Sequence, residues 1–447
     1  MGSSVFPGLQ RDRAVAPAQS IDAGRPVKRA ALLGVDMPGL RPRLLCAQGD
    51  RVAQGQPLFY DRAHPVINFT SPLSGVVQSI TLGPRRTLSA LVISAQTDAD
   101  VSDSQSVMAP ETDPVDASSA EKLRAALQAK GLWPGFLTRP FGRIPAPDAQ
   151  PDAIFVTATA DHSHAPDPRI VLKACGQAFS HGVEALTLLT EGLVHVCQTP
   201  GPDLVEGSHE RVRSQVFESG PATGLAGHHI HLLHPVDRQG QVWTIGYQDV
   251  AAIGQFLTTG SVDPARVIAL TGSHVRRPRL LRTVAGAYLP DLIEGETRPF
   301  AKSFAPGDPK PKSASAAVLS GSPFSGRAAA WLGRYHQQVT LIDSAPERRS
   351  PARQGLLNWL WPGQAARERA GPGPLVPIAD LDRELGFGGP AVPLLRALSV
   401  GDAEAAQRLG CLGMVEDDLA AVSMICTSGA DYGRMLRHVL DELAADA

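Results

Sequence analysis

Ala153-Ile154-Phe155-Val156-Thr157-Ala158 is an almost uninterrupted apolar run, which indicates a strand buried on both faces. A helical pattern follows over residues 168–182, and short strand patterns follow at 185–189, 194–197 and 211–218. Residues 249–257 again have helical spacing and precede an apolar strand pattern at 267–270. This alternation predicts a layered α/β domain with a largely parallel sheet, which we place at residues 115–260.

The α/β segment has no glycine pattern of the kind that holds a nucleotide. A dinucleotide site needs G-x-G-x-x-G, and a P-loop needs G-x-x-x-x-G-K-[ST], between a strand and a helix. The nearest stretch lacks both spacings and reads Gly220-Pro221-Ala222-Thr223-Gly224-Leu225-Ala226-Gly227. We therefore expect no NAD or flavin site of the familiar type in this chain.

Upstream, residues 49–58 and 70–80 contain turn glycines beside short alternating runs that suit β-strands. The two halves resemble a lipoyl or biotinyl carrier domain, a barrel-sandwich hybrid whose modified lysine lies on the hairpin between them. His64 stands at that position, and no lysine occurs from Asp50 to Gly83. We therefore expect a carrier-like domain at residues 1–98 that serves as a structural or docking module, without covalent lipoate or biotin.

Composition excludes several classes of protein. The chain has 447 residues, 42 Lys and Arg against 44 Asp and Glu, and a formal net charge of −2, which argues against a nucleic-acid binder. No window approaches the ~18 consecutive apolar residues of a membrane span, and no secretory signal is visible. The five cysteines are far apart and form no C-x-x-C, which disfavours a disulfide framework, a zinc ribbon and an iron–sulfur cluster.

Two loops carry candidate ligand-binding residues. An apolar run at residues 30–33 leads into a Gly/Pro turn with Gly34, Gly39 and Arg41. This segment is either a plain strand and tight loop, or a loop whose glycines let a flat ligand approach while Arg41 offers hydrogen-bond donors. Residues 138–147 form a proline-rich loop whose candidate residues are Arg139, Phe141 and Arg143.

Two further clusters are ambiguous from sequence alone. The histidines at 228, 229, 231 and 234 invite a zinc interpretation, but no carboxylate or cysteine lies close in sequence, and we predict no metal. The alternatives are that His229 and His231 line a polar cleft, or that the histidines are core or solvated side chains. The second cluster consists of four arginines between residues 276 and 282. It is either a solvated edge strand or a docking patch for a carboxylate-rich protein or a phospholipid, and the near-neutral net charge of the chain favours a protein. Its residues are Arg276, Arg277, Arg279 and Arg282.

The last part of the chain has helical signals. Asp402 precedes an alanine-rich helical pattern that stops at Gly410, and Asp431 precedes a pattern with a single apolar face. We expect a small helical packing domain over residues 331–447.

Segments spread over nearly the whole chain resemble, in order, the A subunit of the bacterial sodium-translocating NADH:quinone reductase. The matching stretches are residues 30–42, 49–80, 138–147, 230–231, 242–243, 247–250, 256–260, 278–283, 332–336, 394–398, 401–402, 406–407 and 409–412. The sequence departs from the family at Cys426, which is followed by Thr427 and Ser428 instead of Pro-Gly.

The resemblance implies an α/β part similar to the flavin subunit of respiratory complex I, followed by a small β-grasp ligand-binding domain at 262–330. It implies a peripheral subunit on the cytoplasmic side of the bacterial inner membrane, held there through the other five subunits of the complex. That complex passes electrons from NADH to ubiquinone and exports sodium. NADH oxidation, flavins and iron–sulfur centres are expected in other subunits, so the isolated chain should be inactive.

Two functions remain open at this stage. The first is quinone binding, with the two loops as contacts, His229 or His231 as proton donor, and ubiquinone as substrate. The alternative is a purely structural docking subunit without a ligand. A ferredoxin-linked relative of the same pump is a third, weaker interpretation, because its cysteine-rich cluster segments are missing.

Overall fold

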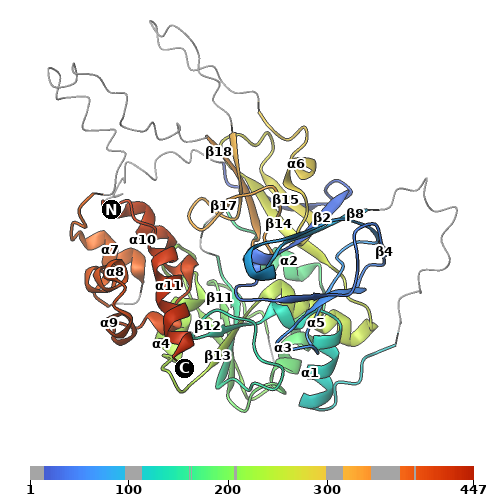
Figure 1. The fold of residues 1–447 in the computed structure, drawn as a ribbon, viewed down its shortest axis with the longest axis horizontal. Helices are drawn as coiled ribbons and strands as arrows, with labels where there is room; N and C mark the ends of the chain where they lie inside the picture. Colours follow the sequence, from blue (N-terminus) through green and yellow to red (C-terminus); the bar gives the residue numbers. More distant parts are fainter. Residues whose placement is uncertain are drawn as a thin grey trace, which may run out of the picture.

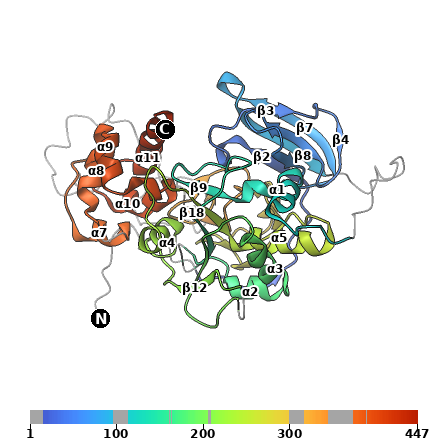
Figure 2. The same ribbon diagram turned by 90° about the horizontal axis from the view of Figure 1, so that it is seen from below.

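The computed structural model describes residues 15–95, 113–160, 162, 164–205, 209–298, 316–343, 373–386 and 389–446. An α/β domain occupies the middle, and the β-rich N-terminal domain and the C-terminal helices lie on opposite sides of it (Figure 1). The view from below in Figure 2 shows the same order. No helix among these residues is long and apolar enough to cross a membrane.

The N-terminal domain is built from two small antiparallel sheets. One has the order β2 (Arg29–Leu33), β8 (Leu88–Ala95), β7 (Gly75–Leu82) and β4 (Arg51–Val52). The other contains β3 (Pro42–Leu44), β5 (Pro57–Asp61) and β6 (Asn68–Thr70). Phe59 of β5 and Phe69 of β6 face each other in this second sheet and stack with ring centroids 4.7 Å apart. The strand predicted around residues 76–80 is confirmed as β7, and His64 lies in the β5–β6 turn.

The α/β domain has a five-stranded sheet. Its order is β12 (Val212–Val216), β11 (Leu193–Gln198), β10 (Ala153–Ala158), β13 (Val242–Gly246) and β9 (Leu137–Arg139). The first four strands are parallel, and β9 is antiparallel to β13. The predicted parallel-rich sheet is therefore confirmed. The helices of this domain are α1 (Ala120–Ala129), α2 (Pro168–Lys173), α3 (Ala178–Leu186), α4 (Ala226–Leu233) and α5 (Tyr247–Thr259).

Two local predictions in this domain are wrong. The single helix expected at 168–182 is two helices, α2 and α3, and the strand expected at 185–189 begins as the last turn of α3. The reason is the packing of α3 on α5, where the backbones approach so closely that a Cβ on Gly254 would lie 1.8 Å from the carbonyl oxygen of Ala178. An apolar run of this length suits a strand or a buried helix equally, and tertiary packing decides between them.

A six-stranded mixed sheet forms the third region, with α6 (Leu289–Leu292) beside it. Its order is β1 (Ala18–Asp22), β15 (Arg279–Val284), β14 (Ala265–Thr271), β18 (Gln338–Asp343), β16 (Ala316–Ser320) and β17 (Arg327–Ala328). β1 precedes the expected boundary at 98, and β18 follows the one at 330. The sheet therefore crosses both expected boundaries, because β1 and β18 find their backbone partners in β15, β14 and β16.

The described residues after 372 form helices around a hydrophobic core of their own. The helices are α7 (Ala379–Leu385), α8 (Ala391–Val400), α9 (Ala403–Arg408), α10 (Ala420–Ile425) and α11 (Tyr432–Ala445), with a 3-10 turn η10 (Glu416–Leu419) before α10. Asp402 and Asp431 cap α9 and α11 as predicted, since their carboxylates accept from the backbone N–H groups of Ala405 and Arg434.

Candidate functional site

The first predicted loop contributes to a cavity, although its three candidate residues do not line it. Gly34 begins a 3-10 turn and lies so close to Leu88 that a Cβ would be 1.7 Å from the Leu88 carbonyl oxygen. Gly39 has a φ of 81° with open space around it, and Arg41 is exposed. Their neighbours Asp36 and Met37 do line the cavity, which is described below.

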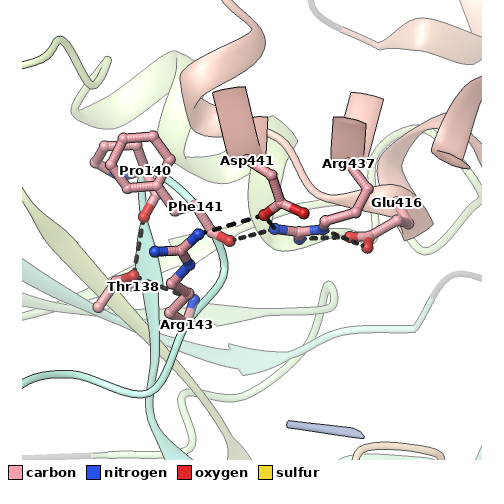
Figure 3. Close-up of polar contacts among 7 residues, drawn as sticks. All are labelled: Thr138, Pro140, Phe141, Arg143, Glu416, Arg437 and Asp441. Carbon is pink, nitrogen blue, oxygen red and sulfur yellow. Dashed lines mark hydrogen bonds and ion pairs between the residues drawn. The ribbon is translucent and has the colours of Figure 1, made fainter. Parts of the chain in front are cut away.

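The second predicted loop divides between two roles. Phe141 and Arg143 face the C-terminal helices, where Arg143 pairs with Asp441 at 3.3 Å and the Phe141 carbonyl oxygen accepts from Arg437 at 2.7 Å (Figure 3). Arg437 also forms a two-pronged ion pair with Glu416, at 2.7 and 2.8 Å. These contacts join the α/β domain to the C-terminal helices. Arg139 instead lies buried under the loop, with 3% of its surface exposed.

His228, His229 and His231 lie on α4, and His234 follows its last residue. Neither predicted proton donor lines the two cavities described below. His229 is fully buried, and its Nε2 lies 3.0 Å from the carbonyl oxygen of Thr223. Burial lowers the pKa of His229 to about 4, so this ring is neutral at neutral pH. His231 is half-buried on the same helix. Among the residues described, no group of three or more His, Cys, Asp or Glu side chains is arranged to hold a metal ion.

The arginine cluster at 276–282 is only partly available for docking. Arg279 pairs with Glu296 at 2.9 Å and with Asp22 at 2.6 Å, and its side chain is 11% exposed. This arginine therefore joins β15 to β1 and to the segment after α6. Arg276, Arg277 and Arg282 remain exposed, the last of them 4.0 Å from Asp263.

A buried ionic cluster joins three regions of the chain. Asp249 of α5 accepts hydrogen bonds through its Oδ1 from the Nη2 of Arg266 on β14 and the Nη2 of Arg334 before β18, the latter at 3.0 Å. The backbone N–H of Arg334 in turn donates to Asp36 of the N-terminal domain at 2.9 Å, and Asp36 also pairs with Arg327. Burial disfavours the Asp249 carboxylate, but the two guanidinium charges outweigh burial and hold the pKa of Asp249 below its usual range.

Two cavities flank this cluster, and Arg266 and Arg334 line both. The first, which we call the junction cavity, has a volume of about 860 Å³ and lies where the N-terminal domain, the α/β domain and the six-stranded sheet meet. Its walls are mainly apolar and include Leu32, Met37, Phe69, Leu132, Pro134 and Val262. An apolar pocket that ends on a few fixed polar groups is typical of a small-molecule site.

The second cavity, which we call the sheet-end cavity, has a volume of about 910 Å³. It is lined by Thr157 and Gly246 at the carboxyl ends of β10 and β13, by Arg139, and by Asp418 of η10. His336 also faces it. Burial and the charge of Arg327 lower the pKa of His336 to about 4, so the ring is neutral there.

Four residues of the ionic cluster, Asp36, Asp249, Arg266 and Arg334, were not predicted as site residues from the sequence. Asp249 and Arg334 lie within the stretches 247–250 and 332–336, but nothing in a single sequence shows that they touch. The one available signal was a carboxylate at a core-facing position of an otherwise apolar helix, because a buried charge requires a partner.

The fold and its cavities define a multidomain α/β protein with cavities between its domains. Three family models match the chain: "NqrA N-terminal barrel-sandwich hybrid domain" at residues 7–96, "NqrA second alpha/beta domain" at 118–262, and "NQRA C-terminal domain", of the SLBB type, at 267–299.

Relatives match over nearly their full length. The NqrA subunit of the Na(+)-translocating NADH-quinone reductase of Yersinia pestis bv. Antiqua is 35% identical, with 98% of each chain covered. The same subunit from Neisseria meningitidis serogroup A is 37% identical, again with 98% of each covered. That of Rhodopirellula baltica is 36% identical, with 95% of this chain and 94% of the relative covered. The chain therefore belongs to the NqrA family, and it is a subunit of the Na(+)-translocating NADH-quinone reductase.

Proposed function

We propose that this chain is the peripheral quinone-binding subunit of the sodium-pumping reductase, and that the junction cavity holds the quinone ring. The observation that carries the proposal is the composition of that cavity, in which apolar walls end on the guanidinium groups of Arg266 and Arg334. Ubiquinone is an apolar molecule with two carbonyl oxygens, so it needs this combination of walls and donors.

The chemistry of the cluster suits a quinone. Each guanidinium has five N–H donors, so Arg266 and Arg334 retain donors beyond the one that each gives to Asp249. Reduction of a quinone builds negative charge on its oxygens, and fixed cationic donors stabilise that charge without reorganising. Asp249 keeps both arginines in place, and it offsets part of their charge when the cavity is empty.

The wider role follows from the family. We infer that the chain sits on the cytoplasmic side of the inner membrane and contacts the bilayer only through the other five subunits. NADH oxidation, flavin and iron–sulfur chemistry, and sodium passage belong to those subunits. The three exposed arginines, Arg276, Arg277 and Arg282, are the remaining candidates for docking on an acidic surface of a partner subunit.

A cavity-filling variant tests the quinone site. Ala285 is half-buried and lines the junction cavity, so Ala285→Phe adds a ring inside the cavity without removing an existing contact. We expect the full chain to bind ubiquinone-1 at least tenfold more weakly in calorimetric titrations. NADH:quinone turnover of the assembled complex should fall with it. Ala330→Phe, at an exposed position outside the cavity, is the matched control.

The same experiment distinguishes quinone binding from the alternative function, that of a docking subunit with no ligand. If the unmodified chain shows no saturable quinone binding, or if Ala285→Phe and Ala330→Phe bind equally well, the junction cavity is not a quinone site. A docking role would then be the better account of the chain. Loss of turnover without any change in quinone affinity would also favour docking.

A further inference from the structure

The sheet-end cavity lies at the point where the order of the parallel strands reverses. The chain leaves β10 toward β11 and β12, and then returns to the other side of β10 as β13. Thr157 near the end of β10 and Gly246 at the end of β13 both line the cavity. In open α/β sheets, the crevice outside the carboxyl ends of the strands at such a switch point is the usual ligand site.

Arg139 is the unsatisfied group in this cavity. It reaches the cavity from β9, next to β13, and its Nη1 makes only long contacts, 3.3 Å to the Thr138 carbonyl oxygen and 3.5 Å to the Thr244 hydroxyl. Its buried Nε has no hydrogen-bond partner. Among the described residues its guanidinium forms no ion pair with a carboxylate, although the charges of Asp418, Asp417 and Glu416 act on it from a greater distance. A buried guanidinium without a counter-ion is costly unless an anion completes the site.

These acidic residues have other partners, and Glu416 pairs with Arg437 at 2.7 Å. Asp418 belongs to η10 and turns its carboxylate to the backbone N–H of Val415 at 2.7 Å. The same carboxylate lies against Gly227 in the first turn of α4, where a Cβ would be 2.5 Å from its Oδ1. Asp418 is therefore held against the start of α4, and Arg139 is left facing the cavity. Asp249, which also lines the cavity, is already shared by Arg266 and Arg334.

We propose that the sheet-end cavity is a second ligand site, which binds a small organic anion through a phosphate or carboxylate group held by Arg139. The cavity, about 910 Å³ with the space at its open mouth included, has room for more than an inorganic anion. Because no glycine-rich loop is present to cradle a phosphate with backbone N–H groups, a side chain must hold the anion. A guanidinium does so with two parallel hydrogen bonds.

The two cavities share Arg266 and Arg334, but Arg139 lines only the sheet-end cavity, so the two proposals can fail independently. Calorimetric titration of the full chain with adenosine monophosphate, succinate and inorganic phosphate tests the proposed anion site. We expect saturable binding of one molecule per chain for the nucleotide or for succinate, and that result identifies the phosphate or the carboxylate class. Ubiquinone-1 should not displace the bound anion.

Arg139→Met removes the guanidinium and keeps the length of the side chain. We expect it to weaken binding of the organic anion at least tenfold, and to leave the melting temperature of the ligand-free chain unchanged or higher, because an unpaired buried charge is removed. The matched control is Arg143→Met, on the same loop, which should bind the anion as the parent does. A purely structural Arg139 would instead show a lower melting temperature.

Three results would overturn the proposal. The first is the absence of saturable binding of any of the three probes at millimolar concentration. The second is equal affinity in Arg139→Met and the parent chain. The third is binding of inorganic phosphate alone, which would reduce the site to a simple ion site. If Arg139→Met failed to fold, Arg139→Lys would decide. It keeps the charge but not the two-pronged geometry, so equal anion affinity in this variant would contradict the role given to Arg139.

Discussion

Asp249→Asn should loosen the contact between the α/β domain and the six-stranded sheet. The substitution keeps the shape of the side chain and removes the charge that Arg266 and Arg334 share. The three side chains are 12%, 13% and 20% exposed, so solvent screens the lost interaction only weakly. Removing one partner of a buried ion pair costs about 3–5 kcal/mol. We expect about 3 kcal/mol here, at the lower end of that range, because asparagine keeps one carbonyl oxygen as an acceptor.

Hydrogen exchange of the full chain measures the loss of stability at individual strands. A local measurement is needed because a multidomain chain does not unfold in one step. With a tenfold change in an equilibrium constant for every ~1.4 kcal/mol, amides of β14 should exchange about 150-fold faster in Asp249→Asn. Glu404→Gln is the control. It breaks an exposed pair with Arg408, whose side chains are 68% and 80% exposed, and it should leave β14 unchanged.

The pH dependence of the exchange difference between Asp249→Asn and the parent chain is a second test of the role of Asp249. Since the folded-state pKa of Asp249 is lowered, its contribution is complete above the unfolded value of ~3.9. That contribution is lost only as the pH falls through the lower folded-state pKa. The difference between variant and parent should therefore stay constant from pH 8 to pH 5. Exchange of β14 within threefold of the parent at neutral pH, or a difference that already shrinks at pH 5, would refute the reasoning.

Two more variants test the packing of the domains. Gly254→Ala should destabilise the α/β domain by at least ~1–3 kcal/mol, because its Cβ would lie 1.8 Å from the carbonyl oxygen of Ala178. Chemical denaturation, followed by the fluorescence of the buried tryptophans, measures this loss of stability. The control Gly389→Ala has open space around its Cβ and should leave stability unchanged. Arg437→Met should release the C-terminal helices from the α/β domain, because Arg437 binds both Glu416 and the Phe141 carbonyl oxygen. Limited proteolysis should then cleave the chain faster between the two regions. Equal cleavage of this variant and of Arg434→Met, a control on the helix surface, would contradict this role of Arg437.

The sequence was informative where a pattern is local. The apolar run at 153–158 and the helical spacing at 249–257 reflect burial that neighbouring residues already determine, and both elements form as predicted. The carrier-like N-terminal domain was also predictable, because its turns and alternating strands lie within a few tens of residues. Cap residues such as Asp402 and Asp431 act within one helical turn and could be read directly.

The sequence was uninformative where the partner is distant. β1 pairs with β15 across more than 250 positions, and no local pattern reveals that Ala18 aligns with Arg279. For the same reason the loop at 138–147 was read as one site. Arg139 and Arg143 are close in the chain, but the strand β9 ends between them, so one lines the sheet-end cavity and the other meets the C-terminal helices.

The ionic cluster lies at a place where an apolar core would serve stability equally well. Buried ion pairs add little net stability compared with well-packed apolar side chains. Here Asp249 holds two arginines that line both cavities, and apolar replacements could not supply donors to either one. We infer that this one carboxylate fixes the position of two guanidinium groups in the walls of both cavities. On this view the binding geometry of each cavity depends on the contact between α5, β14 and the segment before β18, and not on any single loop.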